Sequence, residues 1–223
     1  MEREYISNLE NRKRGFKKMM NEIAVMIPQS VENLQLPDPE LVTYYNNENE
    51  RIFWIEGEIA DDLFEYSKQI IRFNQLDKGI PIEERKPIKF FIDSPGGDLE
   101  TMLAFIGLVR ISKTPIWTIN AGIAYSAAGL ILMSGHKRFA LPNSQTLIHT
   151  GSGSVSGTFD QTTEQMKNYK QLVEKMKDFI LSHTKIDQKL FNKNKSKDWF
   201  IPTDEQLSLG IVDKIVDDLD EIL

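Results

Sequence analysis

The sequence predicts an α/β fold in which the strands of a mostly parallel sheet alternate with helices. From Arg51 onward, short apolar runs of strand length alternate with segments whose apolar residues recur every three or four positions. One of these runs, FFID, leads through a glycine-rich turn directly into such a segment. A longer helical pattern covers residues 159–184. Repeated alternation of this kind is typical of parallel strands joined by helical crossovers.

The first elements follow from their apolar patterns. Residues 51–59 (RIFWIEGEI) are rich in β-branched and aromatic side chains, which predicts a strand. Residues 61–75 carry apolar side chains at helical spacing and are predicted to form a helix against the sheet. A charged loop is expected at 81–87, followed by a second strand at 88–93 (IKFFID). Residues 94–98 (SPGGD) are expected to form a turn.

The central elements continue the alternation. A helix is predicted at 99–111 and a strand at 115–120. Residues 126–133 are predicted to form a buried helix, because small and apolar residues fill this segment. RFALP (138–142) and QTLIH (145–149) are predicted to form short strands. The residues expected to face inward from the helix at 99–111 are Leu103, Phe105, Ile106, Leu108 and Val109.

The long helical pattern follows a Gly/Ser segment, GSGSVSGT at 151–158, which is expected to be a mobile loop. At 1.5 Å per residue the helix would span about 39 Å, which is longer than a compact domain of this size usually needs. We therefore expect part of it to leave the globule and pack on another subunit, with a plain core helix as the alternative. Its apolar side is predicted to contain Phe159, Thr162, Met166, Tyr169, Val173, Met176 and Ile180.

The C-terminal region is predicted to begin with a polar loop around Asp198, FNKNKSKDWF at 191–200. Residues 202–216 (PTDEQLSLGIVDKIV) are then expected to form a short helix, with Thr203 as its N-cap, and a strand. This strand would close the α/β domain.

Residues 1–50 differ from the rest of the chain and are predicted to be an N-terminal appendage and linker, with the α/β domain at 51–223. The linker is expected in the proline- and asparagine-rich stretch 28–49. A basic cluster precedes it on a predicted helix and is either a solvated helix face or a docking or regulatory arm. The cluster consists of Arg12, Lys13, Arg14, Lys17 and Lys18.

The composition is ordinary for a soluble globular protein. The 223 residues are enough for one sizeable core, and the net charge of −6 argues against general nucleic-acid binding, which usually shows a basic excess. The absence of cysteine excludes disulfides and thiolate chemistry. The N-terminus lacks an apolar secretory signal, and the longest uncharged run, 114–135, is too mixed for a membrane span. We therefore expect a cytoplasmic protein without a membrane segment.

Ser126 stands in GIAYSAAG (122–129), a segment otherwise made of small, apolar and aromatic residues. It lies between a predicted strand and a predicted helix, where backbone N–H groups and the helix dipole favour negative charge. Acyl transfer needs such surroundings for its oxyanion, which makes Ser126 a candidate nucleophile. The alternative is a small residue that permits close helix packing. The segment is not a G-x-S-x-G nucleophile elbow, because alanine occupies both glycine places.

His149 is a candidate general base, since it ends a predicted strand just before the Gly/Ser loop. His136, in a turn, and His183, at the end of the long helix, have adequate structural explanations. Spacing alone does not identify the carboxylate that would orient such a base. The glycines of FFIDSPGGD could offer a ligand a second backbone N–H, beside the one that follows Ser126. The sequence contains no H-x-x-H or C-x-x-C pattern, so a metal is not expected.

Several ordered motifs of this chain resemble the ClpP family, the proteolytic subunit of the Clp protease. FFIDSPGGDLETMLAFIGLVR is similar to that family's strand, glycine turn and helix, and INAGIAYSAAGLILMSGHKRFALPNSQTLIHTG to its nucleophile and histidine segments. The long helix ending in LSHT resembles the family's handle helix, and KDWFIPTDEQLSLGIVDKI its aspartate segment and closing strand. The resemblance covers about residues 51–215. It implies the spiral of βα units that ClpP shares with crotonases, with a protruding handle helix.

The resemblance also implies roles for individual residues. Ser126 would be the nucleophile and His149 the general base, and Asp198 would be the orienting carboxylate, since it stands two residues before a phenylalanine as in the family. The N–H groups of Gly97 and Ala127 would form the oxyanion hole. The Gly/Ser segment would supply a strand that pairs with the substrate backbone. Its residues expected to bind substrate are Gly151, Ser152, Gly153 and Ser154.

The function implied is that of a serine endopeptidase. It would cleave polypeptides inside a chamber built from heptameric or tetradecameric rings and fed by an AAA+ unfoldase. No cofactor is expected in the peptidase itself, and ATP would act only through the unfoldase. Four alternatives stay open: a non-catalytic ring subunit, a phage assembly protease of the prohead type, a crotonase-fold acyl-CoA enzyme, and a Ser–Lys relative of the signal-peptide peptidases. The last of these predicts a membrane anchor.

The chain also departs from the family pattern. Residues 1–50 do not resemble the family's N-terminal segment, which forms axial pore loops and contacts the unfoldase. Ala127 stands where methionine is common, and Asp93 where asparagine is common. The segment between Ser126 and RFALP is shorter than usual. These departures indicate a divergent branch, such as a viral or mobile-element homologue, and they bear on the unfoldase partnership more than on the triad.

Overall fold

The structure of the protein, a computed structural model, describes residues 39–151 and 154–223. The chain divides into two compact units, Met1–Thr43 and Tyr44–Leu223. The basic cluster at 12–18 lies outside the described residues, as do Ser152 and Gly153. The domain boundary at residue 50 and the mobility of the Gly/Ser loop stay predictions. Helix α2, Pro39–Asn49, occupies the last part of the expected linker.

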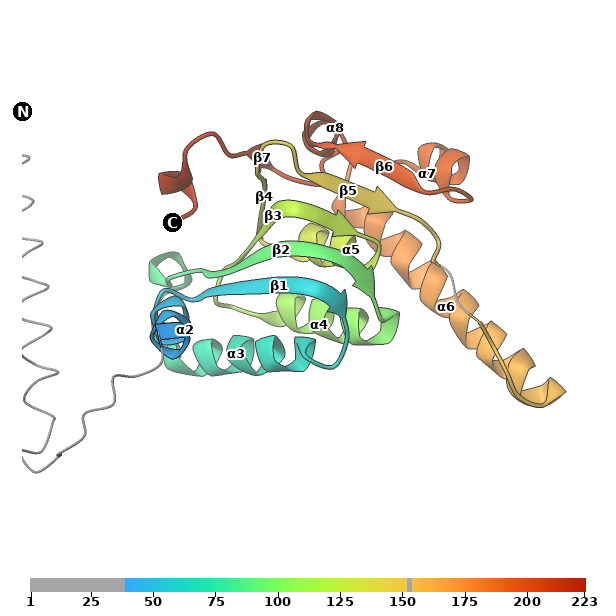
Figure 1. Cartoon of the computed structure of the whole chain (residues 1–223), viewed down its shortest axis with the longest axis horizontal. Helices are drawn as coiled ribbons and strands as arrows, with labels where there is room; N and C mark the ends of the chain where they lie inside the picture. Colours follow the sequence, from blue (N-terminus) through green and yellow to red (C-terminus); the bar gives the residue numbers. More distant parts are fainter. Residues whose placement is uncertain (1–38, 152–153) are drawn as a thin grey trace, which may run out of the picture. The chain divides into compact units, whose positions relative to one another are not determined.

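Seven strands in the described part of the chain form one sheet, and its centre is parallel (Figure 1). Strand β1 (Ile52–Ile59) pairs with β2 (Ile88–Gly97), and β2 pairs with β3 (Ile116–Tyr125). Aromatic side chains of these strands and of helix α4 (Leu99–Ile111) meet in the core, where the Phe90 and Phe105 ring centroids lie 5.4 Å apart. Burying each such side chain contributes about 1.5–3 kcal/mol. The parallel sheet expected from the βα alternation is confirmed.

Strand β3 changes partner along its length. Its first half pairs with β4 (Lys137–Ala140), which pairs in turn with β7 (Lys214–Ile215). Its second half pairs with β5 (Gln145–Ile148), and β5 pairs antiparallel with β6 (Trp199–Pro202). The ends of β3 and β5 and the start of β6 are therefore brought to one region of the sheet.

Strand β2 continues through the residues predicted to form a turn. Its pairing with β1 shifts register between Glu56 and Glu58 and resumes with Gly96 and Gly97. Ser94 is buried, and its hydroxyl donates to the carbonyl of Gly57 at 2.5 Å. The turn prediction is wrong for residues 94–97, because this shifted pairing keeps them in the sheet.

Helices cover one face of the central strands, below β1–β3 in Figure 1. They are α3 (Leu63–Leu76) and α4 (Leu99–Ile111), and the bounds predicted for α4 are confirmed. Helix α5 (Ala127–Ser134) is buried along its whole length and packs against β2, β3 and α4. In α4, Met102 is buried in addition to Phe105, Ile106 and Val109, whereas Leu103 and Leu108 are only half-buried.

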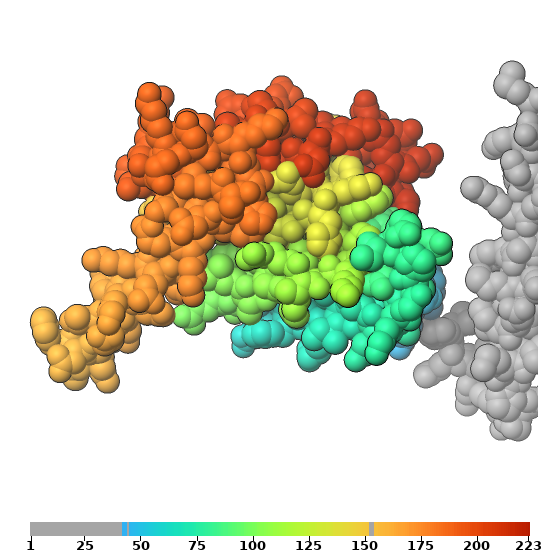
Figure 2. All heavy atoms as spheres, turned by 180° about the vertical axis from the view of Figure 1, so that it is seen from behind, coloured from blue at the N-terminus to red at the C-terminus, as the bar shows by residue number. Residues whose placement is uncertain are grey.

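The predicted long helix is confirmed as α6, Phe159–His183. Its C-terminal half is buried through Met176, Phe179 and Ile180, whereas Phe159 is 84% exposed and Met166 49% exposed. Figures 1 and 2 both show the N-terminal half of α6 extending beyond the other elements of its unit. The described residues therefore leave the first half of the apolar side uncovered, and its packing on another subunit stays a prediction.

Two C-terminal predictions need correction. Helix α7 (Gln188–Asn194) forms where a polar loop was expected, because Asp187 caps it by accepting a hydrogen bond from Leu190 N at 2.7 Å and Phe191 is buried. Helix α8 (Thr203–Ser208) is present, but Thr203 is not its N-cap. The Thr203 hydroxyl donates instead to the carbonyl of Ser144 at 2.7 Å, so it ties α8 to the start of β5.

A buried ion pair joins the start of β1 to the end of α3. Both terminal nitrogens of Arg51 donate to the Asp77 carboxylate at 2.7 Å, and the Thr114 hydroxyl donates to the same carboxylate at 2.8 Å. The side chains of Arg51 and Asp77 are 13% and 2% exposed. The hydrogen bonds from Arg51 hold the pKa of the Asp77 carboxyl below its usual value, so it stays ionised in the folded protein.

Candidate active site

Ser126 occupies a sharp turn between β3 and α5. Its backbone has φ 54° and ψ −120°, a conformation that residues other than glycine seldom adopt. Its N–H donates to the carbonyl of Leu147 at 2.8 Å, and the buried Ala124 fixes the strand before it. Since α5 begins at Ala127, the hydroxyl lies at a helix N-terminus, as the sequence predicts. A strained conformation held by a well-packed core is typical of functional positions.

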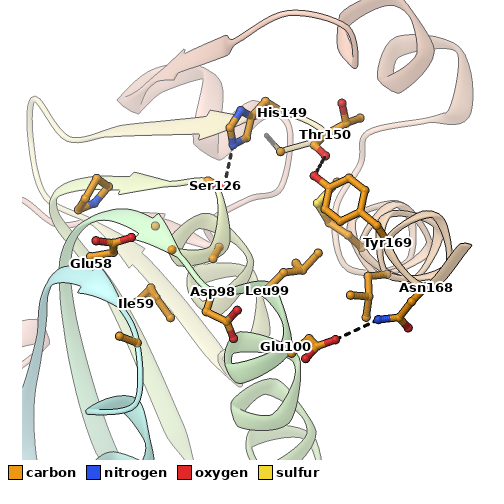
Figure 3. Close-up of a pocket in the computed structure, with 18 of the residues that line it drawn as sticks. Glu58, Ile59, Asp98, Leu99, Glu100, Ser126, His149, Thr150, Asn168 and Tyr169 are labelled. Atoms are coloured by element: carbon orange, nitrogen blue, oxygen red, sulfur yellow. Dashed lines mark hydrogen bonds between the residues drawn. The ribbon is translucent and has the colours of Figure 1, made fainter. Parts of the chain in front are cut away.

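His149 follows β5, the strand that runs beside the end of β3. The register that pairs Tyr125 with Leu147 brings the end of β5 to the Ser126 turn. His149 Nε2 lies 2.7 Å from Ser126 Oγ, a hydrogen-bonding distance (Figure 3). A histidine in this relation to a serine hydroxyl can accept its proton.

Asp198 reaches the other side of the same imidazole. Strand β6 pairs antiparallel with β5 so that Trp199 opposes Ile148, which places Asp198, just before β6, beside His149, just after β5. Asp198 Oδ1 lies 3.3 Å from His149 Nδ1. The side chains of His149 and Asp198 are 26% and 61% exposed, so this contact is open to solvent. The structure thus brings together the three residues that the resemblance selects.

Gly96 and Gly97, the last residues of β2, lie in close contact with neighbouring backbone, and Gly96 packs directly on the Ser126 turn. A Cβ added at Gly96 would lie 2.8 Å from Ser126 Cβ and 3.1 Å from Ala127 N. A Cβ added at Gly97 would lie 2.6 Å from Ile59 N. Both positions therefore require glycine, because side chains there would collide with backbone or with the serine. Gly96 thus lies against the start of α5, and Gly97, the next residue, lies against Ile59 of β1.

A cleft of about 920 Å³ runs past these residues. In Figure 3 its walls come from β1 and the start of α4 on one side and from α6 on the other. Glu58, Asp98 and Glu100 give the first wall negative charge, and no lysine or arginine lines the cleft among the described residues. The hydroxyl and N–H of Thr101 hold the pKa of the Asp98 carboxyl below its usual value. This wall therefore carries negative charge close to Ser126 and His149.

Sequence reasoning did not identify the walls of this cleft. Ile59 from β1 and Asn168, Tyr169, Leu172 and Met176 from α6 all line it. Tyr169 and Met176 belong to the apolar side predicted for the long helix, and this periodicity was the one sequence signal that pointed to these two lining residues. It did not show that the part of the helix between its buried and exposed ends faces a site.

The expected substrate-binding segment is only partly described. Gly151 lines the cleft, and so does Val155, which was not among the selected residues. Ser154 is exposed and is not among the lining residues. Ser152 and Gly153 lie outside the described residues, so a role in binding stays a prediction for the whole segment.

The other two histidines lie away from this site. His136 Nδ1 accepts a hydrogen bond from Ile116 N at 2.9 Å, and burial lowers the pKa of its imidazole. The His183 ring stacks on Phe179 with centroids 4.0 Å apart, at the end of α6. Both rings therefore have structural partners away from Ser126. In residues 39–151 and 154–223, no group of three or more histidines and carboxylates is arranged to hold a metal ion.

A family model, Clp protease, matches residues 39–218. The chain belongs to the Clp protease family. The family expected from the sequence is confirmed, and the mixed α/β architecture with a mostly parallel sheet agrees with the ClpP-like fold. The Clp family match leaves the crotonase-type alternative without support.

Relatives in bacteria cover most of the chain at modest identity. The "ATP-dependent Clp protease proteolytic subunit 2" of Treponema denticola is 32% identical over 169 residues, which are 75% of this chain and 82% of that protein. The "ATP-dependent Clp protease proteolytic subunit" of Deinococcus radiodurans is 28% identical over 202 residues, 88% of this chain and 95% of that protein. A second subunit 2, from Treponema pallidum, is 29% identical over 165 residues, 73% of this chain and 80% of that protein. This chain is thus a divergent member of the Clp protease family.

None of the helices in the described part of this Clp protease family member is at once long and apolar enough to cross a membrane.

Proposed function

We propose that this chain is a serine endopeptidase that hydrolyses peptide bonds with Ser126, His149 and Asp198. The main support is the 2.7 Å contact between Ser126 Oγ and His149 Nε2, made at a strained turn that faces a cleft. The names of the relatives, all proteolytic subunits of a protease, support the same class of reaction. The membership of the Clp protease family agrees with peptide-bond hydrolysis.

The reaction would begin with attack by Ser126 Oγ on the carbonyl carbon of the scissile bond, while His149 Nε2 takes the hydroxyl proton. The negative charge that forms on the carbonyl oxygen would be stabilised by the N–H groups of Gly97 and Ala127. The close contact of Gly96, the neighbour of Gly97, with the start of α5 supports this pairing.

Collapse of the tetrahedral intermediate would break the C–N bond. His149 then gives its proton to the leaving amine, and an acyl ester of Ser126 remains. Water, deprotonated by His149, hydrolyses that ester. Asp198 would accept the Nδ1–H of His149, which keeps the imidazole in the tautomer whose Nε2 is free to accept a proton. Contacts of this kind are often long before substrate binds, as the 3.3 Å distance is here.

We further propose that the peptidase works in an assembly. The uncovered apolar side chains on the first half of α6 support packing between subunits into heptameric or tetradecameric rings. Such rings would hide the sites in a chamber, in the cytoplasm, to which an AAA+ unfoldase delivers polypeptides. ATP would be consumed by that unfoldase, and the peptidase itself would need no cofactor.

Hydrolysis of short fluorogenic peptides by the native protein and by Ser126→Ala tests the proposal. We expect turnover in the native protein and a loss of at least about 10⁴-fold in the variant, because the nucleophile is removed. Ser208→Ala, which removes an exposed hydroxyl on α8, is the matched control and should keep native turnover. Turnover that survives in Ser126→Ala would overturn the assignment of the nucleophile.

Labelling by a small fluorophosphonate, read by mass spectrometry of the intact protein, separates the remaining outcomes. Labelling of Ser126 without peptide turnover would mean a competent site that awaits a partner or ordering of its substrate strand. Neither labelling nor turnover would favour the non-catalytic ring subunit.

A further inference from the structure

The backbone that carries His149 is held from two sides through its next residue, Thr150. Tyr169 Oη, from α6, donates to the carbonyl of Thr150 at 3.1 Å. The Thr150 hydroxyl donates to the carbonyl of Lys195 at 3.1 Å, three residues before Asp198. Thr150 therefore connects α6, the backbone next to His149 and the backbone that precedes Asp198.

Close packing accompanies the first of these contacts. Gly151 has φ 81°, and a Cβ added there would lie 2.6 Å from Tyr169 Oη. The tyrosine hydroxyl thus lies directly over the backbone that follows Thr150. A side chain at residue 151 would displace it, so this position requires glycine both for its conformation and for the approach of Tyr169.

Helix α6 is also tied to the opposite wall of the cleft. Asn168 Nδ2 donates to Glu100 Oε1, on α4, at 3.1 Å, one residue before Tyr169 (Figure 3). Tyr169 is half-buried, and the catalytic steps described above make no use of it. Neighbouring residues of α6 therefore join it to the α4 wall, through Asn168, and to the backbone next to His149, through Tyr169.

We propose that Tyr169 is a positioning residue for the peptidase reaction. Its bond to the Thr150 carbonyl holds His149 within reach of Ser126. The bond from the Thr150 hydroxyl to Lys195 holds the backbone before Asp198 beside His149. The inference rests on the proposed peptidase function. It also makes the reactivity of Ser126 dependent on where α6 lies, since α6 carries the hydroxyl that holds Thr150.

The test uses Tyr169→Phe, which removes the hydroxyl and keeps the ring. Peptide hydrolysis would give kcat and KM, and a small fluorophosphonate, which reaches few cleft residues, would give the rate constant for modification of Ser126. We expect kcat and the modification rate constant each to fall about tenfold, because one neutral hydrogen bond that orients the base is lost. KM should change by less than about twofold, because the ring that lines the cleft remains.

Tyr66→Phe is the matched control. Tyr66 is a helix tyrosine of α3 whose hydroxyl donates to the backbone carbonyl of Trp54 on β1, and it does not line the cleft. Each variant loses the hydrogen bond from its tyrosine hydroxyl to a backbone carbonyl, so the thermal midpoint should fall in both. Only Tyr169→Phe should change kcat and the modification rate constant.

Thr150→Val gives a second, independent variant, since it removes the bond to Lys195 without altering α6. It should lower the same two rate constants. Native rate constants in both Tyr169→Phe and Thr150→Val would overturn the inference. A raised KM with unchanged kcat in Tyr169→Phe would also overturn it, because Tyr169 would then be a substrate contact. Failure of the proposed function looks different: the native protein itself would show neither turnover nor labelling.

Discussion

The pairs Arg51–Asp77 and His149–Asp198 both place an aspartate against a nitrogen-bearing side chain, but their surroundings differ. Asp77 is 2% exposed and accepts two hydrogen bonds from Arg51 at 2.7 Å, with a third from Thr114. Asp198 is 61% exposed and lies 3.3 Å from His149 Nδ1. The first pair lies between elements of the core, whereas the second lies between two strand ends at the edge of a cleft.

This difference shows which part of the site the core holds in place. Ser126 is fixed by β3 and the buried α5, so its hydroxyl is placed by the same packing that stabilises the domain. Asp198 is placed by β6 and by the loop after α7, which are exposed at this point. Three consequences for stability and activity follow from this contrast.

The largest effect on stability is expected from Asp77→Asn. The variant leaves the Arg51 guanidinium buried without its counter-charge, so the free energy of unfolding should fall by about 3–5 kcal/mol. Urea unfolding at pH 7 and one fixed protein concentration measures this. Because the pKa of Asp77 is lowered in the folded state, its contribution is complete above about pH 4 and is lost as the pH falls further. The difference in free energy of unfolding between native protein and variant should therefore become smaller below about pH 4. A difference independent of pH would contradict this account.

A smaller effect, on activity alone, is expected from Asp198→Asn. Loss of the group that orients His149 should lower kcat by about 10²-fold, the lower end of the range for acid–base catalysis, because the pair is exposed. The free energy of unfolding should change by less than about 0.5 kcal/mol. Peptide hydrolysis and urea unfolding of the same preparation measure both quantities. Asp204→Asn, which changes an exposed carboxylate of α8, serves as the control.

If Asp198→Asn destabilised the protein as much as Asp77→Asn, the contrast between the two pairs would be wrong. A native kcat would show instead that Asp198 does not orient the base.

The smallest effect on the free energy of unfolding is expected from Glu65→Gln, on the surface of α3. Glu65 Oε1 and Lys68 Nζ lie 2.5 Å apart, closer than the 2.7 Å between the Arg51 guanidinium and the Asp77 carboxylate. The side chains of Glu65 and Lys68 are, however, 71% and 68% exposed. Since solvent screens such pairs, the free energy of unfolding should change by no more than about 0.5 kcal/mol. The same urea titration checks it. A change comparable to that of Asp77→Asn would show that distance, and not burial, decides the strength of these pairs.

Much of the fold could be predicted from the sequence, because its main elements have strong apolar periodicity. The helix at 99–111 and the long helix are examples. The prediction failed where local composition misleads. The glycines at 96 and 97 usually indicate a turn, yet β1 continues to pair with them after a register shift. The Asn/Lys-rich segment around Asn194 looks like a loop, yet Phe191 and the cap at Asp187 make it a helix.

The candidate triad came from motif resemblance, and spacing alone left the carboxylate open. The structure supplied a reason for Asp198 that no local pattern contains, namely the antiparallel pairing of Trp199 with Ile148. The cleft walls were beyond prediction for the same reason. Glu58 and Tyr169 lie on elements far apart in the chain, and only the packed fold brings them to one cavity.

The backbone conformation at Ser126 sets the stability of the fold against the presence of the hydroxyl. A residue other than glycine at φ 54° and ψ −120° costs about 1–3 kcal/mol in backbone strain. Glycine would relieve much of that strain and would remove the hydroxyl in the same step. One substitution, Ser126→Gly, could therefore raise the stability of the fold while it removes the group that the proposed reaction needs.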